Sequence, residues 1–396
     1  YKGPGENCGQ RNKDWQECLG EVGDADLLKL LETHAFCKET NKWVDLRNGT
    51  EMVAAAFNTS HAHRVPVASA KMRGAWGKCI CDLVGWWPGK APAYQLDGCR
   101  LINAYKTPAL LRNPQAGDTS FWTNHQKRLI PDRVLREYLI DWMAFNLQHP
   151  ELKINHHPLI GGDTRIGKDF VFQPMIRALE PWVAQINEKA AASDYEDHLI
   201  NKLLVVVQEI HSFIGKQAFE DQMKSVLASP PTTLMLNPKG KGKVTAPNLM
   251  SWVMFTNRHY PLNISANDER LFCIWSPLLR ANIAPDYWPG LWGRLNTGGD
   301  EAVVQSLLDR DVSHFNPAAH PPMTDWKVDI IELSGGAATT TIREPLENRS
   351  GIFALDLVRA DDVEEHALPG QSPVAIANAL KNEGCRNLKA QKKVDG

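Results

Sequence analysis

The stretch from residue 161 to residue 169 reads Gly161-Gly162-Asp163-Thr164-Arg165-Ile166-Gly167-Lys168-Asp169. Its spacing from Gly162 to Lys168 matches G-x-x-x-x-G-K, a pattern in which backbone N–H groups surround phosphate oxygens. Glycine suits the fixed positions because a side chain there would block the approach of an oxyanion to the backbone. The pattern predicts a phosphate-binding loop that opens a helix. A Gly-rich turn before a helix is the alternative.

The residue after the lysine departs from the usual pattern. A Ser or Thr hydroxyl normally meets Mg²⁺ at this position, whereas this chain has Asp169. A carboxylate is a hard oxygen ligand that can bind the same ion directly or through water. The predicted nucleotide-binding residues are Gly162, Asp163, Thr164, Arg165, Ile166, Gly167, Lys168 and Asp169.

Length and composition indicate an ordinary soluble globular protein of two or three domains. The 396 residues are 43% hydrophobic and 23% charged, and the mean hydropathy is -0.35. The formal net charge of -2 means that nucleic-acid binding would need a local basic patch. No apolar run approaches the roughly 18 residues of a membrane span, and no signal peptide opens the chain. Eight scattered cysteines lack the spacing of a disulfide scaffold, which favours a reducing cytoplasm.

The predicted fold class is α/β, with three parts. We expect a mixed α/β accessory domain over 1–125, a nucleotide-binding domain over 126–345, and a small C-terminal module with a tail over 346–396. The first part alternates short apolar runs with turn signals. Its Cys79, Cys81 and Cys99 could be zinc ligands, but C-x-x-C spacing and a fourth ligand are missing, so unused thiols are preferred. The chain starts at Tyr1 rather than Met, which suggests a fragment of a longer polypeptide.

Periodicity places a helix and three strands around the loop. A helix is predicted from Pro131 to about His149, followed by a short strand that delivers the chain to the loop. After the loop, Pro174 is predicted to bend the next helix. The run 203–209 is continuously apolar from Leu203 to Val207 and ends in Glu209, as a buried parallel strand would. Ligands bind at the carboxyl ends of such strands, so we expect Glu209 beside the loop.

Two residues that come after Glu209 in the chain, Asn257 and Arg270, are of types that take part in nucleotide hydrolysis. The strand predicted over 250–255 leads to Asn257, whose amide could bind a water or the γ-phosphate, or could cap the next turn. Arg270 lies next to acidic residues and could form a surface ion pair. Alternatively, Arg270 could reach the nucleotide of a neighbouring subunit.

With these residues in place, the sequence resembles the superfamily 3 helicases of phage and poxvirus primase-helicases. The resemblance spans about 131–335 and is carried by 142–150, 162–169, Glu209, Asn257, Arg270, 307–315 and 321–324. The phage branch commonly has G-K-D at the end of the loop. Two positions differ from the family, since Gln208 stands where an acid is usual and Glu269 precedes Arg270 in place of an arginine pair.

The resemblance implies an AAA+-type core with a C-terminal helical or winged-helix-like region, and it implies the role of each residue. Lys168, Glu209, Asn257 and Arg270 would be catalytic, ATP and Mg²⁺ the cofactors, and Asp169 and Glu209 the metal ligands. Basic residues between the second and third strands, Lys239, Lys241 and Lys243, would line the pore of a ring and contact DNA. A solvated surface loop is the alternative for these lysines.

The function predicted from the sequence is an ATP-dependent DNA helicase or translocase in phage or mobile-element replication. Its expected partners are single-stranded or forked DNA, other copies of the chain in a hexameric ring, and a primase or polymerase domain preceding this sequence. The host cytoplasm is the expected compartment. The main alternative is a nucleotide-dependent oligomeric remodelling ATPase or switch that does not unwind DNA. A P-loop kinase is disfavoured because it explains neither Asn257 nor the basic loop.

Overall fold

The computed structural model describes residues 25–385, except 47–49, 75–79, 92, 97–98, 192, 194, 211–225, 228–231, 241, 263, 265–266, 335–340, 343–344, 347, 356, 372 and 383–384. The chain divides into two compact units, which meet in sequence between Thr107 and Pro108. We describe each unit by itself. In the described part of the chain, no helix combines the length and the apolar character needed to cross a membrane.

The first unit mixes helices and strands, as the sequence predicts. Its strands form two small sheets, ordered β3-β2-β1-β4 and β5-β7-β6, and Trp43 stacks on Phe57 in its core with ring centroids 4.7 Å apart. Its elements are α2 (Ala25–Thr33), β1 (His34–Cys37), β2 (Lys42–Asp45), β3 (Glu51–Met52), α3 (Ala54–His61), α4 (Ala68–Gly74), β4 (Ile80–Cys81), β5 (Leu83–Gly85), β6 (Ala93–Leu96) and β7 (Cys99–Asn103).

The second unit is built on a parallel five-stranded sheet of order β14-β8-β13-β10-β9. The strands are β8 (His157–Gly161), β9 (Val183–Asn187), β10 (Leu204–Gln208), β13 (Ser251–Thr256) and β14 (Leu271–Trp275). β8 and β13 are buried along their whole length, which explains why their sequences show no polar alternation. Because all neighbouring strands are parallel, their carboxyl ends meet at one edge of the sheet.

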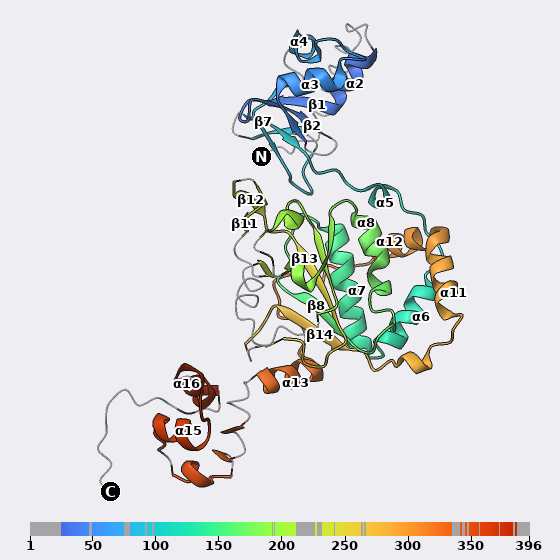
Figure 1. Cartoon of the computed structure of the whole chain (residues 1–396). Coiled ribbons are helices and arrows are strands. Elements are labelled where there is room, and N and C mark those ends of the chain that lie inside the picture. Colours follow the sequence, from blue (N-terminus) through green and yellow to red (C-terminus); the bar gives the residue numbers. More distant parts are fainter. Residues whose placement is uncertain are drawn as a thin grey trace. The chain divides into compact units, whose positions relative to one another are not determined.

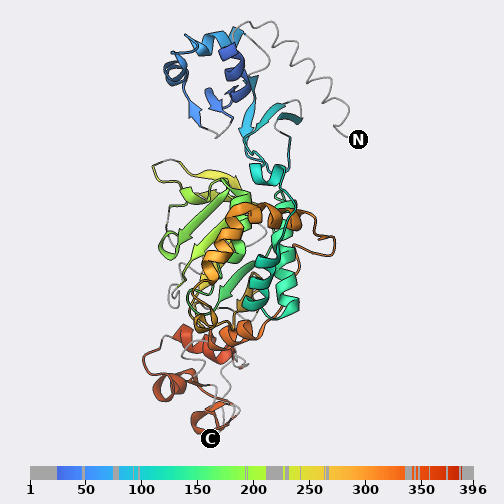
Figure 2. The same ribbon diagram turned by 90° about the vertical axis from the view of Figure 1, so that its right-hand side faces the viewer.

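Helices cover the sheet and follow its strands. They are α5 (Ala109–Arg112), α6 (Ser120–Leu129), α7 (Arg133–Gln148), η1 (Phe170–Phe172), α8 (Gln173–Leu179), α9 (Glu188–Ala191), η2 (Asp197–Leu199), η3 (Arg280–Asn282), α11 (Tyr287–Arg294), η4 (Leu295–Gly299), α12 (Asp300–Leu308) and α13 (Asp325–Ser334). Figure 1 shows α7, α8 and α12 grouped on one side of the sheet. In Figure 2, where the right-hand side of Figure 1 faces the viewer, the orange helices of residues 287–308 lie in front of the green strands, beside teal helices.

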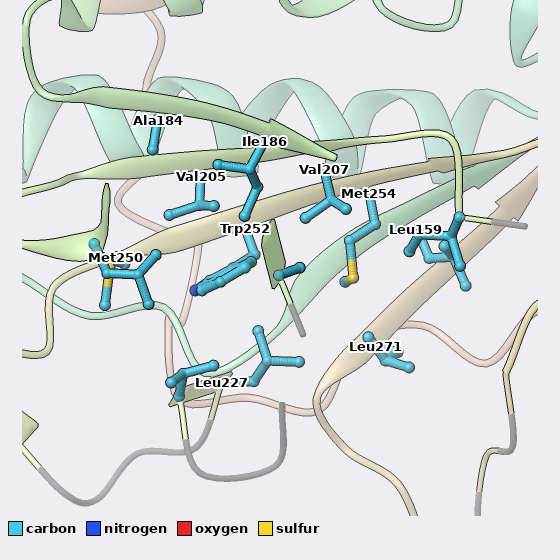
Figure 3. Close-up of a cluster of buried hydrophobic side chains, with 14 of the residues drawn as sticks. Leu159, Ala184, Ile186, Val205, Val207, Leu227, Met250, Trp252, Met254 and Leu271 are labelled. Carbon is cyan, nitrogen blue, oxygen red and sulfur yellow. The ribbon is translucent and has the colours of Figure 1, made fainter. Parts of the chain in front are cut away.

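Alternation along the strands sends successive side chains to opposite faces of the sheet. On one face, Phe255 contacts Phe172 and Phe272 contacts Tyr138 of α7, so this face packs against the helices. On the other face, Val205 and Val207 of β10 join Trp252 and Met254 of β13 in a buried cluster, as Figure 3 shows. The sheet is therefore buried on both sides, and its edge at the strand ends is where a ligand can bind.

The predicted helix before β8 is confirmed, and its ends follow ordinary rules. The α7 helix begins after Asp132, whose carboxylate accepts a hydrogen bond from the Leu135 N–H at 3.0 Å. Farther along α7, the buried Asp141 accepts from Arg310 at 2.6 Å and from His314 at 3.0 Å. Arg310 and His314 thus help to hold α7 in place within the second unit.

The sequence-based prediction for Pro174 is wrong. A continuous helix bent at Pro174 was expected, but the loop is followed by the 3₁₀ turn η1, and α8 begins only at Gln173. Pro174 therefore lies in the first turn of α8, where a missing N–H removes no helical hydrogen bond. The proline starts the helix instead of bending it.

The division of the chain by contacts differs from the expected domain limits. Residues 108–125 group with the second unit, since α5 packs on α8 and α6 packs on α7, η1 and α11. Beyond residue 345, the described elements are η5 (Gly351–Phe353), α15 (Ala360–His366) and α16 (Pro373–Asn382). They share a small apolar cluster around Phe353, Val363 and Ile376. The regular elements described in this segment are helices, and its described residues contain no strand.

Candidate nucleotide-binding site

A cavity of about 470 Å³ lies at the edge of the sheet where β8, β10 and β13 end. Its walls combine the predicted loop with the residues that follow the neighbouring strands. The lining residues are Thr164, Arg165, Ile166, Gly167, Lys168, Asp169, Gln208, Glu209, Phe255, Thr256, Asn257 and Arg280. The structure therefore brings three predicted catalytic residues, Lys168, Glu209 and Asn257, into one cavity.

The backbone of the loop requires its glycines. Gly162 has a φ of +146° and Gly167 a φ of +75°, values that residues with a side chain rarely adopt. Arg165 also has a positive φ, +58°, which is uncommon for a residue other than glycine. The loop thus turns tightly between β8 and η1, with Thr164, Arg165 and Ile166 along the cavity.

Lys168 is the buried cation of the site. Its ammonium group donates to the carbonyl oxygens of Gly162 at 2.8 Å and Asp163 at 2.6 Å, and to Oδ1 of Asn257 at 2.6 Å. Burial lowers the pKa of Lys168 to about 8, while the carboxylates of Asp163, Asp169 and Glu209 act in the opposite direction. Lys168 stays mainly protonated at neutral pH and can bind an anion.

Glu209 directly follows β10 in a strained conformation. Its φ is +52°, and non-glycine residues in this region often belong to functional sites. Hydrogen bonds of the next residue hold the turn, because the Ile210 N–H donates to the Phe255 carbonyl at 2.7 Å. The Thr256 hydroxyl donates in turn to the Ile210 carbonyl, also at 2.7 Å. The ends of β10 and β13 are thereby tied together, with Glu209 exposed at the cavity.

Arg280 is a lining residue that the sequence analysis missed. It follows β14, the strand next to β8, and its backbone N–H donates to Asp163 Oδ2 at 2.9 Å. This hydrogen bond, together with one from the Thr164 N–H, lowers the pKa of the Asp163 carboxyl. The signal in the sequence was the apolar run 271–275, which could have been interpreted as a fourth strand ending near the loop.

The acidic residues of the cavity suit a metal bound together with phosphates. Asp169 and Glu209 both line it, and Gln208 adds a side-chain oxygen. Within the described ranges, no group of three or more His, Cys, Asp or Glu side chains could hold a metal ion alone. Mg²⁺ commonly uses one or two carboxylates and takes its other ligands from phosphates and water. The residues present therefore fit Mg²⁺ as part of a nucleotide complex.

Arg270 lies away from this cavity. It immediately precedes β14, and its carbonyl accepts a hydrogen bond from the His157 N–H at the start of β8, at 2.8 Å. The loop follows the other end of β8. The Arg270 guanidinium is paired with the buried carboxylate of Asp268, with N–O distances of 2.7 and 3.0 Å. Its action on a neighbouring subunit stays a prediction, and within one chain Arg270 is not part of the site.

The basic loop is the tip of an antiparallel hairpin formed by β11 (Thr233–Leu236) and β12 (Val244–Pro247). The hairpin is held by the segment before β10, since Asp197 accepts from the Lys239 N–H at 2.9 Å. The Lys239 ammonium lies 5.8 Å from the ring centroid of Tyr195, which is 49% exposed. Lys239 and Lys243 are exposed, whereas Lys241 lies outside the described residues. Their contact with DNA stays a prediction.

Together, the sheet and the cavity define an α/β protein with a parallel five-stranded core and a cavity at its carboxyl edge. A family model described as "Family of unknown function (DUF5906)" matches residues 159–270, from β8 to Arg270. No curated protein matches the chain.

Solved structures share the fold. The chain is similar to "The apo structure of NrS-1 C terminal region (305-718)", with a TM-score of 0.67 and 17% identity over 83% of this chain and 79% of that one. It is also similar to "The A form apo structure of NrS-1 C terminal region-CTR", with a TM-score of 0.64 and 16% identity over 80% of this chain and 77% of that one. At these identities the likeness concerns the fold.

Proposed function

We propose that the chain is an ATP-hydrolysing motor, an AAA+-type ATPase similar to the superfamily 3 helicases, that translocates on single-stranded DNA. The proposal rests on one observation: Lys168, Glu209 and Asn257 line the same cavity, together with a loop that turns at Gly162 and Gly167. Lys168, Glu209 and Asn257 follow the parallel strands β8, β10 and β13, and they occur along the chain in the order expected for nucleotide hydrolysis. The resemblance of the sequence to the superfamily 3 helicases of phage primase-helicases supports a role in phage or mobile-element replication.

In this proposal, each lining residue has a definite task. The loop's N–H groups and the Lys168 ammonium bind the β- and γ-phosphates and stabilise the charge that develops on them. Glu209 orients the attacking water or accepts its proton, since its exposed carboxylate faces the cavity. Asn257, which now accepts from Lys168, would hydrogen-bond the same water or the γ-phosphate. Mg²⁺ held by Asp169 and Glu209 would neutralise phosphate charge.

The proposed assembly is a hexameric ring with active sites between subunits. Arg270 would complete the site of a neighbour, because it lies away from the cavity of its own chain. The β11–β12 hairpin would face the DNA, since its exposed lysines can neutralise phosphates and its tip lies near the exposed ring of Tyr195. Single-stranded or forked DNA is the proposed partner, and a primase or polymerase domain in the same polypeptide is a further expectation.

ATP hydrolysis measured with and without single-stranded DNA tests this function. We expect the chain to hydrolyse ATP and DNA to stimulate the rate. Lys168→Ala should abolish hydrolysis, because no other described cation is buried in the loop. The variant should remain folded. Hydrolysis at the wild-type rate by a folded Lys168→Ala variant would place the nucleotide site elsewhere. Hydrolysis without DNA stimulation or unwinding would favour the alternative, a nucleotide-dependent oligomeric switch.

A further inference from the structure

The second glycine of the loop contacts two helices outside the cavity. Nε2 of His125, on α6, lies 3.1 Å from the Gly167 carbonyl oxygen. Nδ1 of the same ring lies 2.9 Å from the Tyr287 hydroxyl oxygen at the start of α11. A Cβ atom added at Gly167 would lie only 2.2 Å from the Trp288 ring. The loop is thus packed directly against α6 and α11.

The chemistry of the three groups fixes the direction of both hydrogen bonds. His125 is completely buried, and burial lowers its pKa to about 4, so its ring is neutral at neutral pH. A neutral imidazole has one donor and one acceptor nitrogen. The Gly167 carbonyl can only accept, so Nε2–H donates to it. Nδ1 then accepts from the Tyr287 O–H, and the chain of hydrogen bonds runs from Tyr287 through His125 to Gly167.

This chain of hydrogen bonds orients one peptide group of the loop. In a planar trans peptide, the carbonyl of Gly167 and the N–H of Lys168 point in opposite directions. Holding the carbonyl against His125 therefore turns the Lys168 N–H away from α6. Gly167 and Lys168 both line the cavity, so an N–H turned away from α6 could donate to an oxyanion bound there.

We propose that His125 and Tyr287 are positioning residues for nucleotide binding, which keep the Gly167–Lys168 peptide turned toward the phosphates. The inference rests on the proposed function and deepens it. The segment between β14 and α11 also contacts the start of the loop, where the Arg280 N–H donates to Asp163. Arg128 of α6 lies over the Tyr287 ring at 4.6 Å and holds it in place. A single segment thus contacts the phosphate loop at both of its ends.

The test is a set of substitutions in the full chain, with binding of N-methylanthraniloyl-ATP measured by fluorescence beside thermal melting. Tyr287→Phe removes one hydroxyl, His125→Phe removes the donor to Gly167, and His125→Gln can restore a donor. We expect His125→Phe to weaken binding about tenfold, which corresponds to about 1.4 kcal/mol and lies within the usual contribution of one hydrogen bond. Tyr287→Phe should weaken it severalfold because the ring is no longer held in one tautomer, and His125→Gln should recover part of the loss.

A matched control is available on α7. Tyr138 hydrogen-bonds His156 at 2.8 Å, which is a second tyrosine–histidine pair without a contact to the loop. Tyr138→Phe should lower the melting temperature comparably and leave nucleotide affinity unchanged. Equal loss of affinity in Tyr138→Phe and Tyr287→Phe would mean a merely structural role and overturn the proposal, as would wild-type affinity in Tyr287→Phe and His125→Gln.

The same experiment separates this inference from the proposed function. If the wild-type chain and Lys168→Ala bind the nucleotide equally poorly, the function itself fails, and the inference fails with it. If wild type binds, Lys168→Ala does not, and the His125 and Tyr287 variants match wild type, only the positioning role is overturned. Should His125→Phe fail to fold, Tyr287→Phe and His125→Gln still decide the outcome, because they change the least.

Discussion

The Lys168 ammonium lies 2.6 Å from the Asn257 side-chain oxygen, although the two residues are 89 positions apart in the sequence. The contact arises because β8 and β13 are adjacent parallel strands that end together. The contact connects Lys168, which is proposed to bind the phosphates, with Asn257, which is proposed to hydrogen-bond the attacking water or the γ-phosphate. A ligand that attracts Lys168 must therefore compete with Asn257, so each residue can respond to what the other binds.

Substitution of Asn257 should separate nucleotide binding from hydrolysis. Asn257→Ala removes the polar group proposed to orient the water, so we expect kcat to fall about 10²-fold while KM changes little. Asn257→Asp should behave differently, because a carboxylate would pair with Lys168 and repel the γ-phosphate, which weakens binding. Steady-state ATPase kinetics of both variants give the answer. Wild-type kcat in Asn257→Ala would remove Asn257 from the mechanism.

Nucleotide affinity should decrease at alkaline pH. The pKa of Lys168 is lowered to about 8, so the ammonium loses its proton as the pH rises through this value. Bound phosphates favour the charged form, and binding above pH 8 must then take up a proton, which weakens affinity by up to about tenfold per pH unit. Dissociation constants between pH 7 and 9 test this. Lys168→Arg serves as the control, since its guanidinium stays protonated, and a parallel decrease in this variant would contradict the assignment.

The two unusual positions at the proposed Mg²⁺ site should compensate each other. The usual loop pattern has a hydroxyl at the position of Asp169, and the helicases that the sequence resembles usually have an acid at the position of Gln208. Because this chain gains one carboxylate and lacks the other, the number of carboxylates near the proposed metal is unchanged. Asp169→Asn should raise the Mg²⁺ concentration needed for hydrolysis more than Gln208→Ala does. Gln208→Asp should restore part of the activity lost in Asp169→Ser. Mg²⁺ titrations of the ATPase rate are the measurement, and identical metal dependence in all four variants would refute the coupling.

Arg270 should act across a subunit boundary. We expect Arg270→Ala to bind nucleotide almost normally and to lose turnover by about 10³-fold or more, because an arginine finger stabilises charge in the transition state. Mixing Arg270→Ala with Lys168→Ala subunits should restore part of the activity at composite sites. Asp268 pairs with Arg270, so Asp268→Asn should change the rate as well. Mixed rings without any recovery would argue against a role in trans.

The hairpin lysines should control DNA binding without controlling basal hydrolysis. For each lysine that contacts a phosphate, the logarithm of the affinity for single-stranded DNA falls by about 0.7 when the logarithm of the salt concentration rises by one unit. Replacing Lys239, Lys241 and Lys243 with alanine should weaken single-strand binding, flatten this slope and abolish DNA stimulation. Fluorescence anisotropy at several salt concentrations, combined with an ATPase assay, provides the measurement. An unchanged slope with intact stimulation would show that DNA binds elsewhere.

Sequence alone determined the local elements of the site, because each depends on neighbouring residues. The glycine spacing predicted a loop after a strand, and the structure has a tight loop after β8 in which Gly162 and Gly167 adopt positive φ values. The continuous apolar run before Glu209 predicted a buried parallel strand, which β10 confirms. Pro174 was misjudged because its effect depends on where the helix begins, and the 3₁₀ turn after the loop moves that start to Gln173.

Tertiary structure decided which of these elements meet. Placing β8 between β14 and β13 brings Asn257 to Lys168 and Arg280 to Asp163, contacts that depend on strand order and register. The same holds for His125, which reaches Gly167 only because α6 packs beside the loop. A periodic pattern specifies which face of an element is buried, whereas the neighbour of that face depends on packing between segments far apart in the chain.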